Sequence, residues 1–157
     1  MSAIASHAYR TPPPSATVME LLDRAQASLL SASQAGEVGE RYVLAHLAGL
    51  RAAAAVLAAR TSPARSSRSS RPRSVWEVLP ALAPEFTEWA VFFAASARQR
   101  AAVERGDRIL PAREADDLVR QAETFIEVVQ DALGVPRTFV RPDYLAPVTP
   151  LARHAGR

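Results

Sequence analysis

Apolar residues recur every three or four positions in two long stretches of the first half of the chain. The first stretch follows Thr17 and Glu20, which have the spacing of a helix-capping box, and contains Val18, Leu21, Leu22, Ala25, Leu29 and Leu30. The second contains Val43, Leu47, Leu50, Ala54 and Leu57. This spacing predicts helices over about 17–34 and 39–60. The second has few polar residues and is expected to be the central helix.

The second half of the chain predicts two more long helices. Ser74 and Glu77 form another capping box, and two prolines then limit the helix that follows to one or two turns. The apolar spacing resumes and predicts helices over about 84–105 and 111–133. No alternating, strand-like pattern competes with these helices. The predicted fold class is therefore all-α, an up-and-down four-helix bundle.

Three segments lack this periodicity. Residues 1–14 end in three prolines and predict a disordered arm. Residues 61–73 contain only small, polar and basic side chains and predict a flexible basic loop between two helical hairpins. Residues 135–157 carry four prolines and predict a Pro/Arg-rich irregular tail. The helical bundle is therefore expected over residues 15–134.

The composition narrows the class of protein. A chain of 157 residues with 48% apolar residues is long enough for one domain, and its 32 alanines favour helix. It has no cysteine and three histidines, which excludes disulfides, Cys-ligated zinc and thiol catalysis. We expect no cofactor and no metal. No apolar run approaches the roughly 20 residues of a membrane span, so we expect a cytoplasmic protein that does not bind a membrane.

All 19 positively charged residues are arginines, and they are unevenly distributed. The predicted loop carries four of them and no acid: Arg65, Arg68, Arg71 and Arg73. These guanidinium groups could bind the phosphates of RNA or DNA in a salt-sensitive manner, without selecting a base sequence, because no aromatic residue lies among them. The alternative is a solvated linker. Residues 74–134 are acidic by contrast, with six arginines and eleven acids.

Three polar residues interrupt the predicted central helix at intervals of five: Arg41, His46 and Arg51. Successive members lie about 140° apart around a helix, so they do not share one face. In one interpretation His46 acts as acid or base while an arginine stabilises a phosphate, as metal-free RNA cleavage requires. In the other, His46 is a half-buried structural residue and the arginines pair with acids of the last helix. Asp116 or Glu123 could then reach Arg51.

Two further sets of side chains each allow a functional and a structural interpretation. The last helix is rich in acids, including Glu123 and Glu127 one turn apart, but no histidine or EF-hand glycine pattern accompanies them, so an arginine-paired face is favoured over a metal site. Phe92 and Phe93 place aromatic surface on two sides of the third helix. One side is available to bury a second subunit, and we expect a homodimer.

Three segments carry a family resemblance: RYVLAHLAGLRAAAAVLAAR at 41–60, SVWEVLPALAPEFTEWAVFFAASA at 74–97 and AREADDLVRQAETFIEVVQDALG at 112–134. In their order and spacing, the chain resembles the HEPN superfamily of nucleotide-binding helical domains, and in particular a small branch from high-GC bacteria. This resemblance implies an up-and-down bundle that dimerises. Many HEPN domains are also metal-independent RNases that use an arginine and a histidine separated by four to six residues. Arg41 and His46 match that spacing, although on the second helix instead of a late one.

We therefore expect a HEPN-like module that binds a nucleotide or nucleic acid without cleaving it. Its expected phosphate contacts come from His46, Arg51 and the four arginines of the loop. One alternative is a metal-independent endoribonuclease of toxin or defence type that uses Arg41 and His46. The other is an interaction adaptor that recruits a protein partner through its arms.

Overall fold

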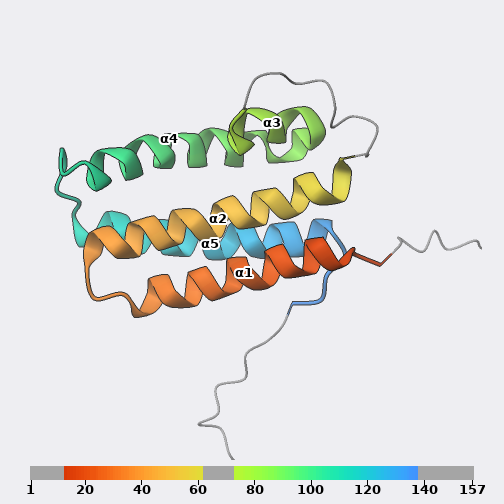
Figure 1. Cartoon of the computed structure of the whole chain (residues 1–157), viewed down its shortest axis with the longest axis horizontal. Helices are drawn as coiled ribbons and strands as arrows, with labels where there is room; N and C mark the ends of the chain where they lie inside the picture. The colour runs from red at the N-terminus through yellow and green to blue at the C-terminus, as the bar shows by residue number, and fades with distance from the viewer. Residues whose placement is uncertain (1–12, 62–72, 138–157) are drawn as a thin grey trace, which may run out of the picture.

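The computed structural model describes residues 13–61 and 73–137, which form an all-α bundle (Figure 1). Its four long helices run up and down beside one another: α1 (Ala16–Gln34), α2 (Val38–Arg60), α4 (Thr87–Glu104) and α5 (Ala112–Ala132). A short helix, α3 (Val75–Leu82), and a 3-10 turn, η2 (Pro84–Phe86), precede α4. Neither described stretch contains a strand. The predicted fold class is confirmed.

Serine side chains cap two of the helices. Ser74 caps α3 by accepting the backbone N–H of Glu77 at 3.3 Å, which confirms the second predicted cap. The capping box predicted at Thr17 is wrong, because Ser15 caps α1 by accepting the N–H of Val18 at 3.3 Å. Ser15 directly follows the three prolines and has the extended backbone that an N-cap residue needs. Thr17 lies inside the helix.

The prolines of the α3 region divide the chain as expected. α3 continues through Pro80 and ends after eight residues, at Leu82. Pro84 then opens η2, in line with the preference of proline for the first position of a helix. The main chain turns here, so that α3 and η2 cover one end of α4 (Figure 1).

The interior of the bundle is lined by the smallest residues of α2. Its buried positions include Ala45, Ala48, Gly49, Ala52 and Ala55, and the alanines among them have no exposed surface. The larger aliphatic residues whose spacing predicts this helix are only partly buried: Val43, Leu47, Leu50 and Leu57. Alanine and glycine allow neighbouring helices to approach closely, so α2 turns its small side inward and its leucines fill the margins.

α2 packs along both α1 and α5 and also contacts α3 and α4, which confirms its predicted central position. α4 packs against α2 and α3, whereas its backbone hardly approaches that of α5. At the α2–α4 crossing, a Cβ atom on Gly49 would collide with the ring of Phe93. Glycine is required there because the ring lies directly against the backbone.

By length and composition, α2 is also the one described helix apolar enough to cross a membrane. The expectation that no such run exists is corrected on this point. Half of its most apolar window is buried inside the bundle. Its buried alanines contact other helices of the bundle.

Candidate functional site

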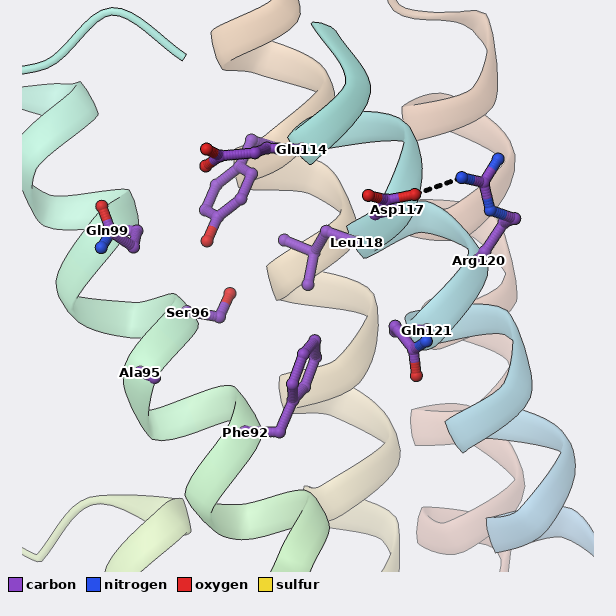
Figure 2. A pocket seen from close by; sticks show the side chains of 10 residues that line it. Phe92, Ala95, Ser96, Gln99, Glu114, Asp117, Leu118, Arg120 and Gln121 are labelled. Atoms are coloured by element: carbon purple, nitrogen blue, oxygen red, sulfur yellow. Dashed lines mark hydrogen bonds and ion pairs between the residues drawn. The ribbon is translucent and has the colours of Figure 1, made fainter. Parts of the chain in front are cut away.

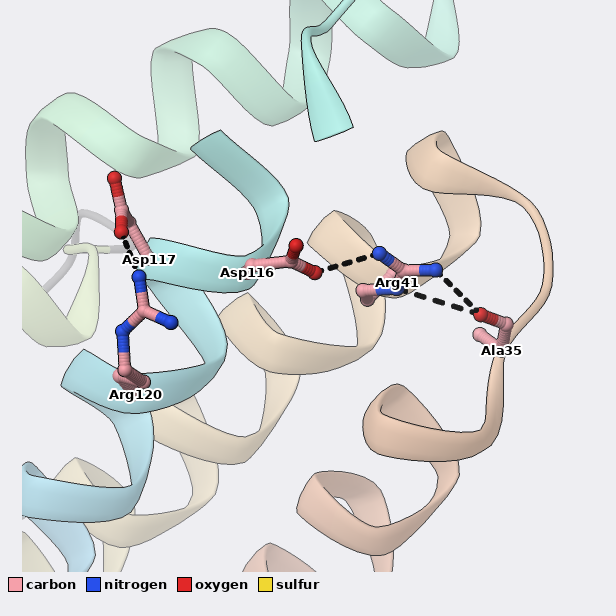
Figure 3. Close-up of polar contacts among 5 residues, drawn as sticks. All are labelled: Ala35, Arg41, Asp116, Asp117 and Arg120. Atoms are coloured by element: carbon pink, nitrogen blue, oxygen red, sulfur yellow. Dashed lines mark hydrogen bonds and ion pairs between the residues drawn. The ribbon is translucent and has the colours of Figure 1, made fainter. Parts of the chain in front are cut away.

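Arg41 joins three elements at one end of the bundle. Its Nη1 donates a hydrogen bond to Oδ1 of Asp116 in α5 at 2.6 Å, while Nε and Nη2 donate to the carbonyl of Ala35 at 3.3 and 3.1 Å (Figure 3). The side chain is 21% exposed. The guanidinium group thus caps the C-terminal end of α1, where helices leave carbonyls without partners. One of the two predicted arginine–acid pairs is present here.

His46 is buried between α2 and the α3–α4 hairpin. It is 2% exposed, and its Nδ1 lies 3.0 Å from Oγ of Ser96. The rings of Trp76 and Phe93 stand edge-on to the imidazole, at centroid distances of 5.9 and 6.1 Å. Burial, followed by the charge of Arg100, lowers the pKa of His46 from 6.5 to about 4. The imidazole is therefore neutral at pH 7.

Arg51 faces α1. Its Nη1 donates to Oγ of Ser28 and to the carbonyl of Arg24, the latter at 3.2 Å. The expectation that Asp116 or Glu123 pairs with Arg51 is wrong, because Arg41 lies closer to the N-terminal end of α5 and takes Asp116.

The structure therefore gives Arg41, His46 and Arg51 separate neighbours, as their five-residue spacing requires, and brings no two of them together. Of the loop arginines, Arg73 is described and is exposed. Arg65, Arg68 and Arg71 lie outside the described residues, so their predicted phosphate contacts stay predictions.

A groove opens where α4 and α5 stand apart, and we call it the α4–α5 groove (Figure 2). Its volume is about 380 Å³. Three buried residues, Tyr42, Ser96 and Leu118, lie at its floor, and Phe92 stands at its rim with 40% of its surface exposed. The other lining residues are Ala95, Gln99, Glu114, Asp117, Arg120 and Gln121.

Charged groups on the rim of the groove are paired. Arg120 donates to Asp117, and both side chains are more than half exposed (Figure 2). Arg108 binds both carboxylate oxygens of Glu114, at 2.9 and 3.1 Å, and also donates to Gln99. The groove thus combines an exposed aromatic ring, amide groups and balanced charges.

A second hollow lies on the other side of the first turns of α5. Its volume is about 400 Å³, and it is lined by Ser33, Arg41, Asp116, Val119 and Arg120. We call it the Arg41 hollow. Arg120 lines both the hollow and the groove, and Figure 3 shows its pair with Asp117 beside the pair of Arg41 with Asp116.

The acids of α5 mostly serve as partners of arginines. Besides those already described, Asp131 binds Arg137, whose hydrogen bond lowers the pKa of that carboxyl below its usual range. Within residues 13–61 and 73–137, no three His, Asp or Glu side chains converge as metal ligands. Sequence reasoning did not single out Ser96 and Gln99, since an isolated polar residue on an amphipathic helix carries no local signal for a groove.

A family model for SAV_6107-like HEPN domains matches residues 32–130. The chain belongs to this HEPN family. The match extends from the end of α1 almost to the end of α5, and includes both hollows as well as Arg41, His46 and Arg51. The resemblance to the HEPN superfamily is confirmed. Neither a curated protein nor a solved structure matches the chain.

Proposed function

We propose that this HEPN module binds a nucleotide, free or as a unit of RNA, with the base in the α4–α5 groove and the phosphate in the Arg41 hollow. The observation that carries the proposal is the position of Arg120, which lines both hollows. Its side chain is 66% exposed, and its guanidinium group has one hydrogen-bond partner among the described residues, Asp117. Its remaining N–H groups are therefore free to bind a phosphate.

The groove suits a flat, polar ring. Its volume of about 380 Å³ falls within the range of roughly 300–1,000 Å³ that is typical of small-molecule sites. The exposed ring of Phe92 offers a face on which a base can stack, an interaction worth about 1–3 kcal/mol. The amides of Gln99 and Gln121 supply donors and acceptors for the edge of the base.

The Arg41 hollow suits a phosphate. Arg41 and Arg120 both line it, and each is paired with one carboxylate. The pair of Arg120 with Asp117 is exposed, and such pairs contribute about 0–1 kcal/mol to stability. Exchanging this carboxylate for a phosphate therefore costs little. Arg41 is more deeply set and keeps its place through the carbonyl of Ala35.

The proposed module binds and does not cleave. A general base must come within about 2.6–3.2 Å of the proton that it removes. His46 is 2% exposed and lies behind Ser96, on a different side of α2 from Arg41. The use of Arg41 and His46 in an endoribonuclease stays a prediction, which RNA cleavage in EDTA and its loss in His46→Ala would support.

The test is a calorimetric titration of the full-length protein with AMP, GMP, CMP and UMP. We expect at least one of them to bind, and Phe92→Ala and Arg120→Gln each to weaken binding about tenfold or more, through lost stacking and a lost charged hydrogen bond. Two variants serve as matched controls. Val91→Ala changes an exposed neighbour on α4, and Arg24→Gln removes another exposed, acid-paired arginine on α1.

Wild-type affinity in both control variants is the expected result. The proposal fails if no mononucleotide binds at millimolar concentration, or if Phe92→Ala and Arg120→Gln bind as the wild type does.

A further inference from the structure

Ser96 connects the α4–α5 groove to the interior of the bundle. It lies at the groove floor with 4% of its surface exposed, and Figure 2 shows its side chain directed from α4 toward Leu118. Its Oγ also lies 3.0 Å from Nδ1 of His46. A serine hydroxyl has one proton and two lone pairs, so one contact with His46 leaves hydrogen-bonding capacity unused. That capacity is available at the groove floor.

His46 itself is closed off from the groove. The rings of Trp76 and Phe93 flank it, and Ser96 is its one side-chain hydrogen-bond partner among the described residues. A neutral imidazole carries a proton on one nitrogen and a lone pair on the other. If Nδ1 carries the proton, it donates to Ser96, whose own proton is then free for a ligand. If Nε2 carries it, Nδ1 accepts from Ser96, which then offers only lone pairs to the ligand.

We infer that Ser96 contacts the nucleotide in the groove and that His46 is a positioning residue, whose tautomer lets the Ser96 hydroxyl act as donor or acceptor toward that nucleotide. The inference rests on the proposed nucleotide binding. It gives His46 a role one residue removed from the ligand, in place of the acid–base role that its spacing from Arg41 suggests. It also explains why a polar pair is present among aromatic rings, where apolar side chains would pack without needing partners.

Three variants separate positioning from simple packing. Ser96→Ala removes the hydroxyl, and we expect it to weaken nucleotide binding about fivefold, the effect of one lost hydrogen bond. His46→Leu leaves Ser96 without its partner and should give a similar loss. His46→Asn places an amide near the position of Nδ1, which can also donate or accept, and should restore most of the affinity.

Ser28→Ala is the matched control. Ser28 is also a serine with 4% of its surface exposed and one long-range side-chain partner, Arg51, but it lies between α1 and α2 on the far side of the bundle. We expect this variant to bind nucleotide as the wild type does. Circular dichroism of every variant checks that the helices are intact.

A spectroscopic readout follows the tautomer itself. In the wild type at pH 7, the ¹⁵N chemical shifts of the two ring nitrogens of His46 should move toward one tautomer as the nucleotide that binds is added. In Ser96→Ala they should not move. If His46→Leu does not fold, Ser96→Ala and these ring shifts still decide the matter.

The outcomes separate the two proposals. If binding depends on Phe92 and Arg120 but is unchanged in Ser96→Ala, and the ring shifts of His46 stay constant, the inference is wrong and the proposed function stands. If no mononucleotide binds at all, both are wrong.

Discussion

The two sides of α2 are built differently. Toward α1 and α5, α2 presents fully buried alanines, and the helices run close together. Toward the α3–α4 hairpin, α2 presents Gly49 and His46 to the ring of Phe93. That ring is also stacked with Trp76 of α3 at a centroid distance of 5.0 Å and meets Phe125 of α5 at 5.2 Å. Alanines close the first interface, whereas aromatic rings of α4 and α5 fill the space beside the α4–α5 groove. The candidate site thus lies on the side of α2 where its neighbours contribute aromatic rings.

The largest effect is expected where the aromatic layer is removed. Phe93 is fully buried and contacts four other aromatic rings besides that of His46. Phe93→Ala should lower the free energy of unfolding by about 3–5 kcal/mol through the cavity that it leaves. Urea denaturation measures this. A loss below 1 kcal/mol would mean that the rings do not support the hairpin.

Lowering the pH from 7 to 4 is expected to lower the free energy of unfolding by about 3 kcal/mol through His46. The pKa of His46 is about 4 in the folded protein against 6.5 as its ordinary value, so the unfolded chain takes up the proton first. The contribution of His46 to the free energy of unfolding is therefore fully present above pH 6.5. It falls as the pH is lowered and is lost by about pH 4. Urea denaturation between pH 7 and 4 should show this slope in the wild type and a flatter one in His46→Asn.

The described carboxylates with lowered pKa values titrate mainly below this window. The pKa values of Glu85 and Asp131 are lowered by hydrogen bonds from Arg60 and Arg137, so their contribution is lost at more acidic pH. Identical slopes in the wild type and His46→Asn would contradict the buried, neutral state of His46.

The smallest effect on stability is expected for leucine substitutions at a matched pair of alanines. Ala52 has no exposed surface in the closed interface of α2, whereas Ala95 is exposed and lines the groove. Ala52→Leu should cost about 1–3 kcal/mol by overpacking. Ala95→Leu should change stability by less than about 0.5 kcal/mol, as exposed substitutions do, while obstructing nucleotide binding. Equal costs at both positions, measured by thermal unfolding, would contradict the difference between the two interfaces.

The helices could be located from the sequence because their signals are local. The break between α3 and α4 was predicted from prolines, and the start of α3 from Ser74. The family resemblance rested on the order and spacing of three segments, and the family match confirms it. The error at the start of α1 was also local, since Ser15 and Thr17 are both suitable caps and only the extended backbone at Ser15 decides between them.

The residues that meet at the candidate site are determined by the packing of the helices. Local sequence patterns are enough to place the helices, the central position of α2 and the five-residue spacing that keeps Arg41, His46 and Arg51 apart, because periodicity and turn residues act within a few positions. The packing of the helices is needed to show that α2 turns its alanines inward, that Arg41 pairs with Asp116 75 residues away, and that Ser96 lies between His46 and a groove. These contacts join segments distant in the chain, and the sizes and shapes of the side chains between the helices determine which of them meet.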